Sequence, residues 1–476
     1  AAATQTVTLT KDSGSFGTAL SADTNHAFVV ATGKTFSVGN NVTVLANGGN
    51  TGFSSTVVLK GTGSTLNVDT GSTLTRTNGA NGVLRFAGTG TVNVAGTTSF
   101  ASGGGGGLML SSYAADNVTV NVNNGGLLSS TGTGSNQSAY GAIVVANSAG
   151  TGTGIGVLNI NNGGSVSTSV STGSNGGVVI ARNSGNGTIN LNPGGTLTAP
   201  RVTHGGSSSS GTAISTFNFN GGTLVPTMTN NGTGATSGGY LVGLTRANVR
   251  DGGAKFNTSG FDVTVAQGLE HSDIEGDAAT DGGLTKSGLG TLTLSGSNNY
   301  TGTTTVNGGT LTVSSSGSLN ATSGVSNNGS GAKLLFNSFT PIPSTTTLTQ
   351  GTLDGIGILG DLTLANSAAA ILQNGDGTAT SFQMGALSFN GGATLNLKTD
   401  LVNAPLQPTD VNASSGSATI NVTSTVPWTQ GSHSLIAGSG TFTGSASNFT
   451  LGTVSPSLSV RQSASLAVSG SNLNLV

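Results

Sequence analysis

The sequence predicts an all-β protein, a right-handed parallel β-helix that ends in a small β-rich cap at the C-terminus. Two recurring phrases and their uneven spacing predict it. One phrase is an apolar–Asn–apolar triplet and the other is an Asn-Gly-Gly turn. The triplet occurs at Leu66-Asn67-Val68, Val92-Asn93-Val94, Val120-Asn121-Val122, Leu158-Asn159-Ile160, Ile189-Asn190-Leu191, Phe217-Asn218-Phe219, Leu395-Asn396-Leu397, Ile420-Asn421-Val422 and Leu473-Asn474-Leu475.

Each triplet is part of a period-two alternation, which is the pattern of a strand with one buried face. In the segment 118–122, VTVNV, the valines share one face, whereas the threonine and the asparagine share the other. The asparagines are therefore expected to point outward. There they either bond to the asparagines of neighbouring coils as a ladder or simply meet solvent.

The turns follow several of these strands, at positions such as Asn124-Gly125-Gly126 and Asn162-Gly163-Gly164. Glycine and asparagine adopt positive φ at little steric cost, so the chain can reverse there. The Gly pairs that begin at 125, 163, 194 and 221 are 38, 31 and 27 residues apart. This spacing favours a solenoid with loops of varying length, with roughly 20–25 residues per coil. A β-sandwich is the alternative, but it would rarely need 400 residues of such strands.

The composition excludes several classes of protein. Of the 476 residues only 6% are charged, the net charge is −2 and the 14 basic residues are scattered. The absence of a basic stripe argues against nucleic acid as a partner. There is no cysteine, which excludes a disulfide framework and thiolate metal sites. No apolar run reaches the ~20 residues of a membrane span, and the start at Ala1 predicts a secreted chain whose signal peptide was removed.

The segment Gly282–Val313, GGLTKSGLGTLTLSGSNNYTGTTTVNGGTLTV, closely resembles the passenger-associated transport repeat, also called the autotransporter-associated β-strand repeat. The similarity lies in Leu284-Thr285-Lys286, Gly290–Leu294, Asn299–Gly302 and Gly308–Leu311, and Ala254–Leu269 resembles the segment that leads into such repeats. The direct resemblance thus covers 254–313. It implies a secreted bacterial β-helix, displayed on the cell surface in many members of the family.

We expect three regions along the chain. Residues 1–240 should form irregular solenoid coils, and residues 241–400 should form a solenoid that contains the repeat. Residues 401–476 hold Pro405, Pro408, Pro427 and the single tryptophan, Trp428. This shift in composition predicts a capping subdomain with hairpins.

The acidic segment Glu270–Asp281, EHSDIEGDAATD, is the candidate metal site. It contains both glutamates of the chain and five of its sixteen acidic residues. Asp273, Glu275 and Asp277 alternate, so on a strand they would share a face and could bind Ca²⁺ together with backbone carbonyls. The alternative is an exposed polar loop between coils. Asn374-Gly375-Asp376-Gly377 is interpreted as a turn.

No catalytic motif is found in the sequence, and the prediction is that the protein is not an enzyme and has no cofactor other than possible calcium. Arg246, Arg250 and Asp251, with Arg201 and His204 elsewhere, come nearest to the charged groups of a polysaccharide-cleaving β-helix. The four histidines, His26, His204, His271 and His433, form no His-x-x-x-His unit.

Three functional hypotheses follow. The first is a secreted structural protein that assembles with itself into a fibre, sheath or surface layer, because the ends of a solenoid are sheet edges that recruit further strands. Under this hypothesis the strand-like ends Thr6–Leu9 and Leu473–Val476 would form the contacts. The second is a cell-surface adhesin that contacts polysaccharide or other cells, and the third is a carbohydrate-active enzyme.

Overall fold

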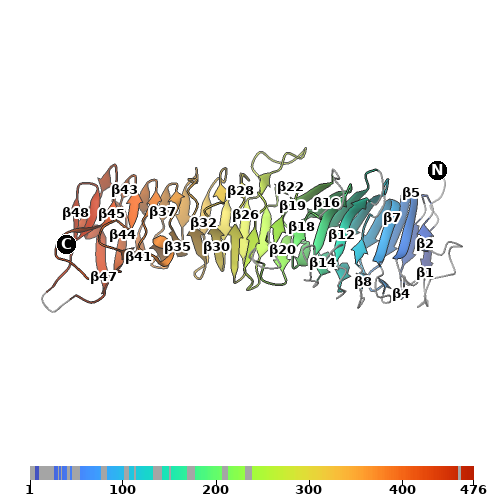
Figure 1. Ribbon diagram of the computed structural model, residues 1–476, viewed down its shortest axis with the longest axis horizontal. Helices are drawn as coiled ribbons and strands as arrows, with labels where there is room; N and C mark the ends of the chain where they lie inside the picture. The colour runs from blue at the N-terminus through green and yellow to red at the C-terminus, as the bar shows by residue number, and fades with distance from the viewer. Residues whose placement is uncertain are drawn as a thin grey trace. The chain divides into compact units, whose positions relative to one another are not determined.

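The computed structural model describes residues 6–9, 26–30, 32–33, 35–39, 43–45, 54–76, 83–100, 107–111, 114–131, 142–148, 152–168, 177–205, 213–230, 239–458 and 462–476. The chain forms two compact units. Unit 1 comprises Ala1–Asn257 and Phe261–Asp277, and unit 2 comprises Thr258–Gly260 and Ala278–Val476. Both are built almost entirely of strands that pair in parallel between successive coils, so the predicted parallel β-helix is confirmed (Figure 1).

Unit 1 winds through three faces in each coil. The first face contains β2 (His26–Val30), β9 (Leu108–Met109), β12 (Ile143–Ser148), β15 (Val178–Asn183), β18 (Val202–Thr203), β21 (Leu241–Val242) and β24 (Val263–Val265). The second contains β1 (Thr6–Leu9), β3 (Thr35–Val38), β10 (Asn117–Val122), β13 (Ile155–Ile160), β16 (Asn186–Leu191), β19 (Ile214–Phe219), β22 (Arg246–Val249) and β25 (Glu270–His271). Two long strands, β5 (Ser54–Val68) and β7 (Val83–Val94), run over both of these faces.

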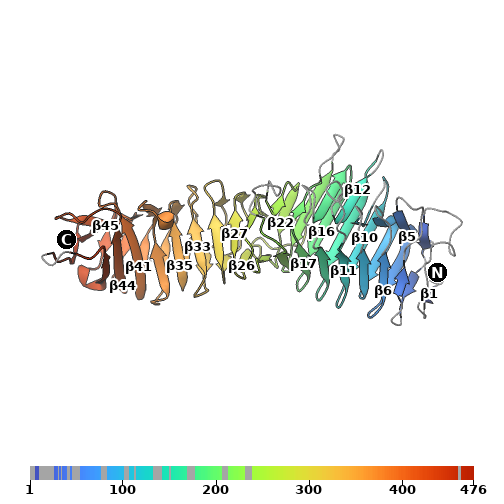
Figure 2. The ribbon, with the colours of Figure 1, turned by 60° about the horizontal axis from the view of Figure 1, so that its bottom comes forward.

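The third face of unit 1 is a separate parallel sheet (Figure 2). Its strands are β4 (Thr43–Leu45), β6 (Thr73–Arg76), β8 (Thr97–Phe100), β11 (Leu127–Ser130), β14 (Ser165–Thr168), β17 (Thr196–Ala199), β20 (Thr223–Pro226) and β23 (Ala254–Asn257). One coil is therefore β12, β13 and β14, and the next is β15, β16 and β17.

The apolar residues of the triplets stack in two buried columns under the second face. The strand β13 pairs in register with β10 and β16, so that Leu158 lies between Val120 and Ile189. All three side chains are fully buried, as is Ile160 at the next inward position. A coil cannot cover its own apolar face, and the recurrence of the triplet supplies that cover from the coils on both sides.

The asparagines between these columns form a ladder, the first of the two alternatives left open by the sequence. From Asn93 onward, each side-chain amide Nδ2 donates to the Oδ1 of the asparagine one coil earlier, at 2.7–3.0 Å. The members are Asn67, Asn93, Asn121, Asn159, Asn190, Asn218 and Asn248. A second, shorter ladder joins Asn123, Asn161 and Asn192 just before the turns. These amide chains tie successive coils together outside the core.

The two glycines of the turn Asn162-Gly163-Gly164 meet two different structural constraints. Gly163 has a φ of +71°, a left-handed conformation that favours glycine. Gly164 lies so close to the preceding coil that a Cβ there would be 2.3 Å from the carbonyl oxygen of Val122. The phrase therefore marks where one coil turns against its neighbour.

Unit 2 contains two long parallel sheets. One holds β26 (Leu284–Ser287), β29 (Thr304–Val306), β32 (Val325–Asn327), β34 (Thr346–Leu348), β37 (Leu362–Leu364), β40 (Leu387–Phe389), β43 (Val411–Asn412) and β46 (Phe442–Thr443). The other holds β27 (Thr291–Leu294), β30 (Thr310–Val313), β33 (Lys333–Phe336), β35 (Gly351–Gly355), β38 (Ala370–Gln373), β41 (Gly392–Thr399), β44 (Ser417–Ser424) and β47 (Phe449–Ser455).

The remaining strands of unit 2 form two smaller sheets. One pairs β28 (Ser297–Asn298) with β31 (Ser318–Leu319). The other contains β36 (Ile358–Leu359), β39 (Phe382–Met384), β42 (Leu406–Pro408), β45 (His433–Ala437), β49 (Asn472–Leu475) and β48 (Leu466–Ser469), in this order. Two short 3₁₀ turns, η2 (Gly375–Gly377) and η3 (Ala446–Asn448), lie between strands.

The C-terminal part of unit 2 closes the sheet with an antiparallel hairpin, as the predicted cap requires. However, the expectation that Leu473–Val476 forms an open edge is wrong. The strand β49 pairs with β45 on one side and with β48 on the other, and Leu473 and Leu475 are buried. Among the described strands, β48 is therefore the edge strand at this end of the sheet, and β36 lies at the other.

Coil length differs between the two units. Ladder asparagines of adjacent coils in unit 1 are 26 to 38 residues apart, more than the predicted 20–25. In unit 2 the corresponding spacing is 20 residues for Asp281 with Thr301 and 25 for Asn396 with Asn421, but it rises to 31 for Asp410 with Thr441 near the C-terminus. In the described part of the chain, no helix has the length and apolar character needed to cross a membrane.

Candidate functional site

Two carboxylates at the start of the predicted acidic site form ion pairs with an arginine of the preceding coil. Arg246, the first residue of β22, forms ion pairs with Glu270, at 3.1 Å from Nε to Oε2, and with Asp273, at 2.8 Å from Nη1 to Oδ2. The hydrogen bond from Arg246 is the main reason why the pKa of Asp273 is lowered. Asp273 lies at the surface, so this pair is exposed to screening by solvent and salt.

Asp277 is held more firmly. The guanidinium of Arg250 donates from Nε to Oδ2 at 2.8 Å and from Nη2 to Oδ1 at 2.7 Å, the two-pronged geometry that arginine makes with a carboxylate. The Asp277 side chain is only 6% exposed. Hydrogen bonding from Arg250 is the largest cause of the lowered pKa of Asp277, and the same bond raises the pKa of Arg250.

This pair predicts an acid-sensitive contribution to the stability of unit 1. Since the pKa of Asp277 is lower in the folded chain, the contribution is fully present above the unfolded value of about 4. It is lost as pH falls through the lower folded value. We expect Arg250→Gln to cost about 1 kcal/mol at pH 7 and to flatten the acid limb of a plot of melting temperature against pH. Arg246→Gln is the matched control, with a smaller effect because its partner Asp273 is exposed. Equal flattening in both variants would contradict this assignment.

The three carboxylates proposed for calcium do not share one site. Asp273 and Asp277 contact different arginines, and Glu275 is exposed between them. Among the described residues, no group of three or more histidine, aspartate or glutamate side chains is placed to hold a metal ion. The arrangement itself supports the alternative of a polar loop between coils, and calcium binding stays a prediction.

Asp281, the last residue of the acidic segment, has a structural position in unit 2. Its buried carboxylate accepts hydrogen bonds from the backbone N–H of Gly283 (2.8 Å), Thr301 (2.7 Å) and Gly302 (2.9 Å), and from the Thr301 hydroxyl (3.1 Å). The last two residues belong to the Asn299–Gly302 phrase of the next coil. The aspartate therefore fixes the turn that follows Tyr300, whose buried hydroxyl lies 2.6 Å from that of Thr304.

Two further aspartates also accept hydrogen bonds from the next coil. The sequence analysis did not predict these contacts. Asp361 accepts from the backbone N–H of Ala386 at 2.8 Å, and Asp410 accepts from both the N–H and the hydroxyl of Thr441. Each lies directly before a strand, β37 or β43, and reaches one coil forward. An aspartate just before the first apolar residue of a strand is the signal that could have found them.

Lys286 is the most unusual charged group of unit 2, because its side chain is fully buried. Its ammonium Nζ donates to the carbonyl oxygens of Ser287 (3.0 Å), Gly288 (2.8 Å) and Gly308 (2.8 Å). Burial of an ammonium is costly unless hydrogen bonds replace its water, and three converging carbonyls supply them. The lysine thus joins the turn that follows β26 to the turn one coil later.

The glycines around Lys286 make this arrangement possible. Gly288 and Gly309 have φ values of +73° and +63°. A Cβ on Gly309 would be 2.7 Å from the Lys286 ammonium and 2.4 Å from the carbonyl oxygen of Gly290. The Lys-Ser-Gly phrase of this segment therefore supplies the ammonium, and the Asn-Gly-Gly phrase one coil later supplies a carbonyl that accepts from it.

His204 and its neighbours form a network between coils of unit 1. The Nδ1 of His204 lies 3.0 Å from the hydroxyl of Ser215, and Ser215 exchanges hydrogen bonds with Thr245. Burial lowers the pKa of His204. Ser215 is fully buried, so a substrate cannot reach its hydroxyl in this state. Arg201 directly precedes β18 on the first face, whereas Arg246 begins β22 on the second face and Arg250 directly follows that strand. The side chain of His26 lies outside the described residues.

The segment Asn374–Gly377 is a turn, as expected, with an unusual backbone. Gly375, Asp376 and Gly377 all have positive φ, and Asp376 lies in the left-handed helical region. The backbone N–H of Asp376 donates to the buried carboxylate of Asp354, which forms a 3.0 Å ion pair with Lys333. Asp354, Asn374 and Gly377 border a shallow groove of about 500 Å³ over β38, β41 and β44.

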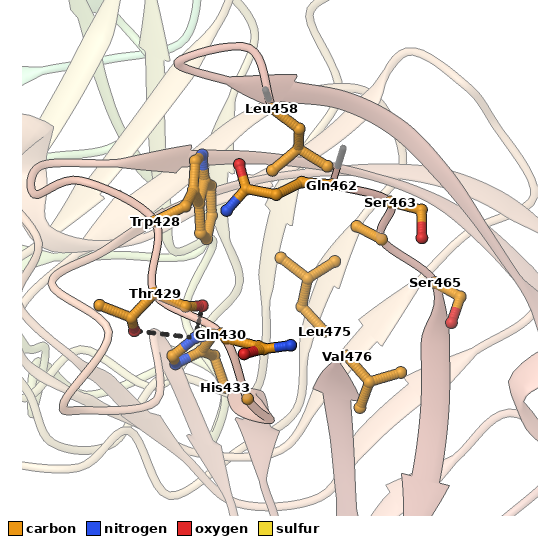
Figure 3. Close-up of a pocket in the computed structure, with 12 residues that line it drawn as sticks. Trp428, Thr429, Gln430, His433, Leu458, Gln462, Ser463, Ser465, Leu475 and Val476 are labelled. Atoms are coloured by element: carbon orange, nitrogen blue, oxygen red, sulfur yellow. Dashed lines mark hydrogen bonds between the residues drawn. The ribbon is translucent and has the colours of Figure 1, made fainter. Parts of the chain in front are cut away.

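Another cavity of unit 2 lies in the cap and has a volume of about 550 Å³. Trp428, His433, Gln430, Gln462 and Leu475 line it, together with Thr429, Gly431, Leu458, Ser463, Ala464, Ser465 and Val476. Figure 3 shows the side chains of Trp428, Gln462, Gln430 and Leu475 arranged around a common space. Sequence reasoning did not predict it, because the lining comes from two loops and one strand that are distant in sequence.

Residues 284–313 match the family model described as Passenger-associated-transport-repeat. This segment is an autotransporter-associated repeat. No curated protein and no solved structure matches the chain. The match confirms the resemblance over the second half of the predicted range, 254–313.

The transport repeat coincides with the contacts described above. It begins at Leu284, the first residue of β26, and ends at Val313, the last residue of β30. Within it lie Lys286, its carbonyl partners and the turn fixed by Asp281. Its strands β27 and β30 pair in register, with Leu292 against Leu311 and Leu294 against Val313. The repeat is thus a segment of solenoid that contains the Lys286 contact between coils and the turn to which Asp281 bonds.

Proposed function

We propose that this protein is a secreted structural solenoid of the autotransporter-passenger type, which acts as a scaffold at the cell surface. The transport repeat and the parallel β-helix make the chain similar to autotransporter passengers and indicate a secreted or surface protein. The observation that carries the proposal is that many of its buried and half-buried polar side chains form hydrogen bonds between coils. The asparagine ladders, Asp281 and Lys286 all bond one coil to the next.

The closed C-terminal sheet favours a discrete particle over growth from that end. The strand β49 is paired on both sides, and the ladder between β44 and β47 shifts register between Ile420 and Val422. A bulge in an outer strand is one of the devices by which proteins discourage further strand addition. Electron microscopy and sedimentation velocity of the purified chain test the proposal. We expect discrete monomers, and regular filaments would contradict it.

Self-assembly through the N-terminal edge is the second candidate function. Among the described strands, β1 pairs only with β3, through Thr6–Leu9 against Thr35–Val38. A strand that is paired along one edge has backbone N–H and C=O groups along its opposite edge. The sheet edge of a second copy of the chain could pair with these groups. This candidate replaces the two-ended assembly expected from the sequence.

Deletion of residues 1–10 tests this second candidate. If copies associate through β1, the truncated chain should stay folded and lose the association that the full chain shows in sedimentation. The full-length assembly should persist at 1 M salt. Salt at this concentration screens interactions between charges more than ~3 Å apart, whereas main-chain hydrogen bonds do not depend on such charges. Association that survives the deletion, or that salt dissolves, would place the contact elsewhere. The third hypothesis, a carbohydrate-active enzyme, is tested separately by turnover of a panel of polysaccharides.

A further inference from the structure

We propose that the groove over β38, β41 and β44 binds a short acidic glycan, with the carboxylate of a hexuronate unit placed on the ammonium of Lys398. The groove has a volume of about 500 Å³, within the ~300–1,000 Å³ range of small-molecule sites. The side chains that carry the proposal lie between 373 and 453, a stretch that the structure describes without a gap. The proposal goes beyond the scaffold function, which would stand even if this groove bound nothing.

The groove is lined by two columns of half-buried or exposed side chains on the outer face of the sheet. Gln373, Asn396 and Asn421 lie in register on three successive coils and form the first column. Lys398 and Thr423 lie two residues further along their strands, in register with each other, and form the second. The columns are about 7 Å apart and successive coils about 4.8 Å apart. A linear ligand that lies across the strands would therefore meet further polar groups at each coil.

The turn η2 fixes the cationic end of the groove. The buried side chain of Asn374 accepts from the backbone N–H of Lys398 at 2.8 Å and donates to its carbonyl oxygen at 2.9 Å, so it continues the sheet in place of a strand. The ammonium of Lys398 donates to the carbonyl oxygen of Gly377. The ammonium is thus positioned before a ligand arrives, which reduces the entropic cost of binding.

A bulge in β47 forms the opposite end of the groove. The backbone N–H of Thr453 donates to Oδ1 of Asn421 at 2.8 Å. A Cβ on Gly452 would be 2.3 Å from the same oxygen, so the glycine permits this close contact. Gln373 and Thr453 are three coils apart, or about 14 Å along the stack. This length suits a segment of a few sugar units.

Several hydrogen-bond donors in the groove have no partner among the described residues. They are the side-chain amide of Gln373, Nδ2 of Asn396 and the hydroxyls of Thr423 and Thr453. An ammonium has three N–H donors, and Lys398 uses one of them on the turn. In contrast, Oδ1 of Asn396 already accepts from the next coil. The groove therefore offers more donors than acceptors, which favours a ligand rich in acceptor oxygens.

The lining selects among classes of ligand. A carboxylate forms a charge-assisted hydrogen bond with an ammonium, and sugar hydroxyls can accept from the amides while the ring carbons contact the methylene groups of the same side chains. A hydrocarbon chain would bury the amides without hydrogen bonds, which costs free energy. An extended peptide binds by pairing with an open sheet edge, whereas β38, β41 and β44 are each paired on both sides.

Titration calorimetry of the full chain tests the proposal with three ligands of similar length. Trigalacturonate is the acidic glycan, cellotriose is a neutral glycan and triglutamate is an acidic peptide. We expect saturable binding of trigalacturonate that weakens as salt is added, because salt screens the exposed part of the charge interaction. Its affinity should exceed that of the other two ligands. The absence of saturable binding, or equal or tighter binding of cellotriose or triglutamate, would overturn the proposal.

Three variants locate the binding. Lys398→Gln removes the charge and should weaken trigalacturonate binding about tenfold to a hundredfold, the usual effect of losing a hydrogen bond to a charged group. Lys255→Gln is the matched control, because Lys255 is an exposed lysine on β23 of unit 1, away from the described lining, and its loss should leave the affinity unchanged.

Gln373→Ala provides a second measurement that does not depend on the lysine. It should weaken binding about threefold to tenfold, the usual effect of one lost neutral hydrogen bond. Circular dichroism of each variant shows whether the solenoid is folded. Affinities that are unchanged in folded Gln373→Ala and Lys398→Gln, or that fall equally in Lys255→Gln, would show that the glycan does not bind in this groove.

Discussion

Replacement of Leu158 by Asp should unfold the coils around β13 and cost unit 1 several kcal/mol of stability. The side chain is fully buried between Val120 and Ile189 of the neighbouring coils. A carboxylate at this point would be buried with no partner, one of the few changes that exceeds about 4 kcal/mol. The direct measurement is hydrogen exchange of the backbone amides of β10, β13 and β16, which should lose protection together because repeats stabilise their neighbours.

Asn159→Ala is the matched control, one residue further along the same strand. Asn159 donates to Asn121 and accepts from Asn190, and its side chain is half-buried on the outer face. The loss of these two bonds should cost about 1–2 kcal/mol, with the core columns intact. Protection should therefore fall slightly at β13 and remain at its neighbours. An equal loss in the two variants would show that the assignment of inner and outer faces is wrong.

The core of the fold could be predicted from the sequence because its physical cause is local. Alternation of apolar and polar residues decides which side chains of a strand point inward, so Leu158 and Ile160 were correctly placed inside and Asn159 outside. Coil length in unit 1 could not be read in the same way. Asn121 and Asn159 are bonded although 38 residues separate them, because loops of any length can connect strands whose registers still match.

The strands that pair with the last strand also could not be predicted from the residues of that strand alone. The segment Asn472–Leu475 alternates as a strand should, and it is the strand β49. Its neighbours depend on the hairpin that places β48 on its outer side, which the alternation does not encode. An element can therefore be predicted from its own residues, whereas its exposure to a second molecule depends on segments elsewhere.

The acidic segment shows the same limit for a site. Its residues are close in sequence, but Asp277 contacts Arg250, which is 27 residues earlier, and Asp281 contacts Thr301, which is 20 residues later. In a solenoid the nearest neighbours of a side chain belong to the coils on either side. Spacing within one segment therefore suggested a shared calcium site, whereas the contacts are made between coils.

Lys286→Met should destabilise unit 2 by about 2–4 kcal/mol, the value of losing hydrogen bonds to a charged donor without replacing them. The methionine keeps most of the buried stem and removes the ammonium that joins the carbonyls of Ser287, Gly288 and Gly308. The opposing effect is relief of the cost of burying a charge. We expect the lost bonds to dominate, because three carbonyls point at the ammonium within 3.0 Å. Hydrogen exchange at β26 and β29, which pair at Lys286 and Val306, measures the effect.

Lys398→Met provides the comparison within the same unit. Lys398 is half-buried on β41, and its ammonium donates to the carbonyl of Gly377 alone among the described contacts. This change should cost less than about 1 kcal/mol and leave the exchange at β26 unchanged. If Lys286→Met instead proved neutral or stabilising, the desolvation cost would outweigh the three hydrogen bonds. The lysine of the transport repeat would then fix which turns meet without adding to the stability of the coil.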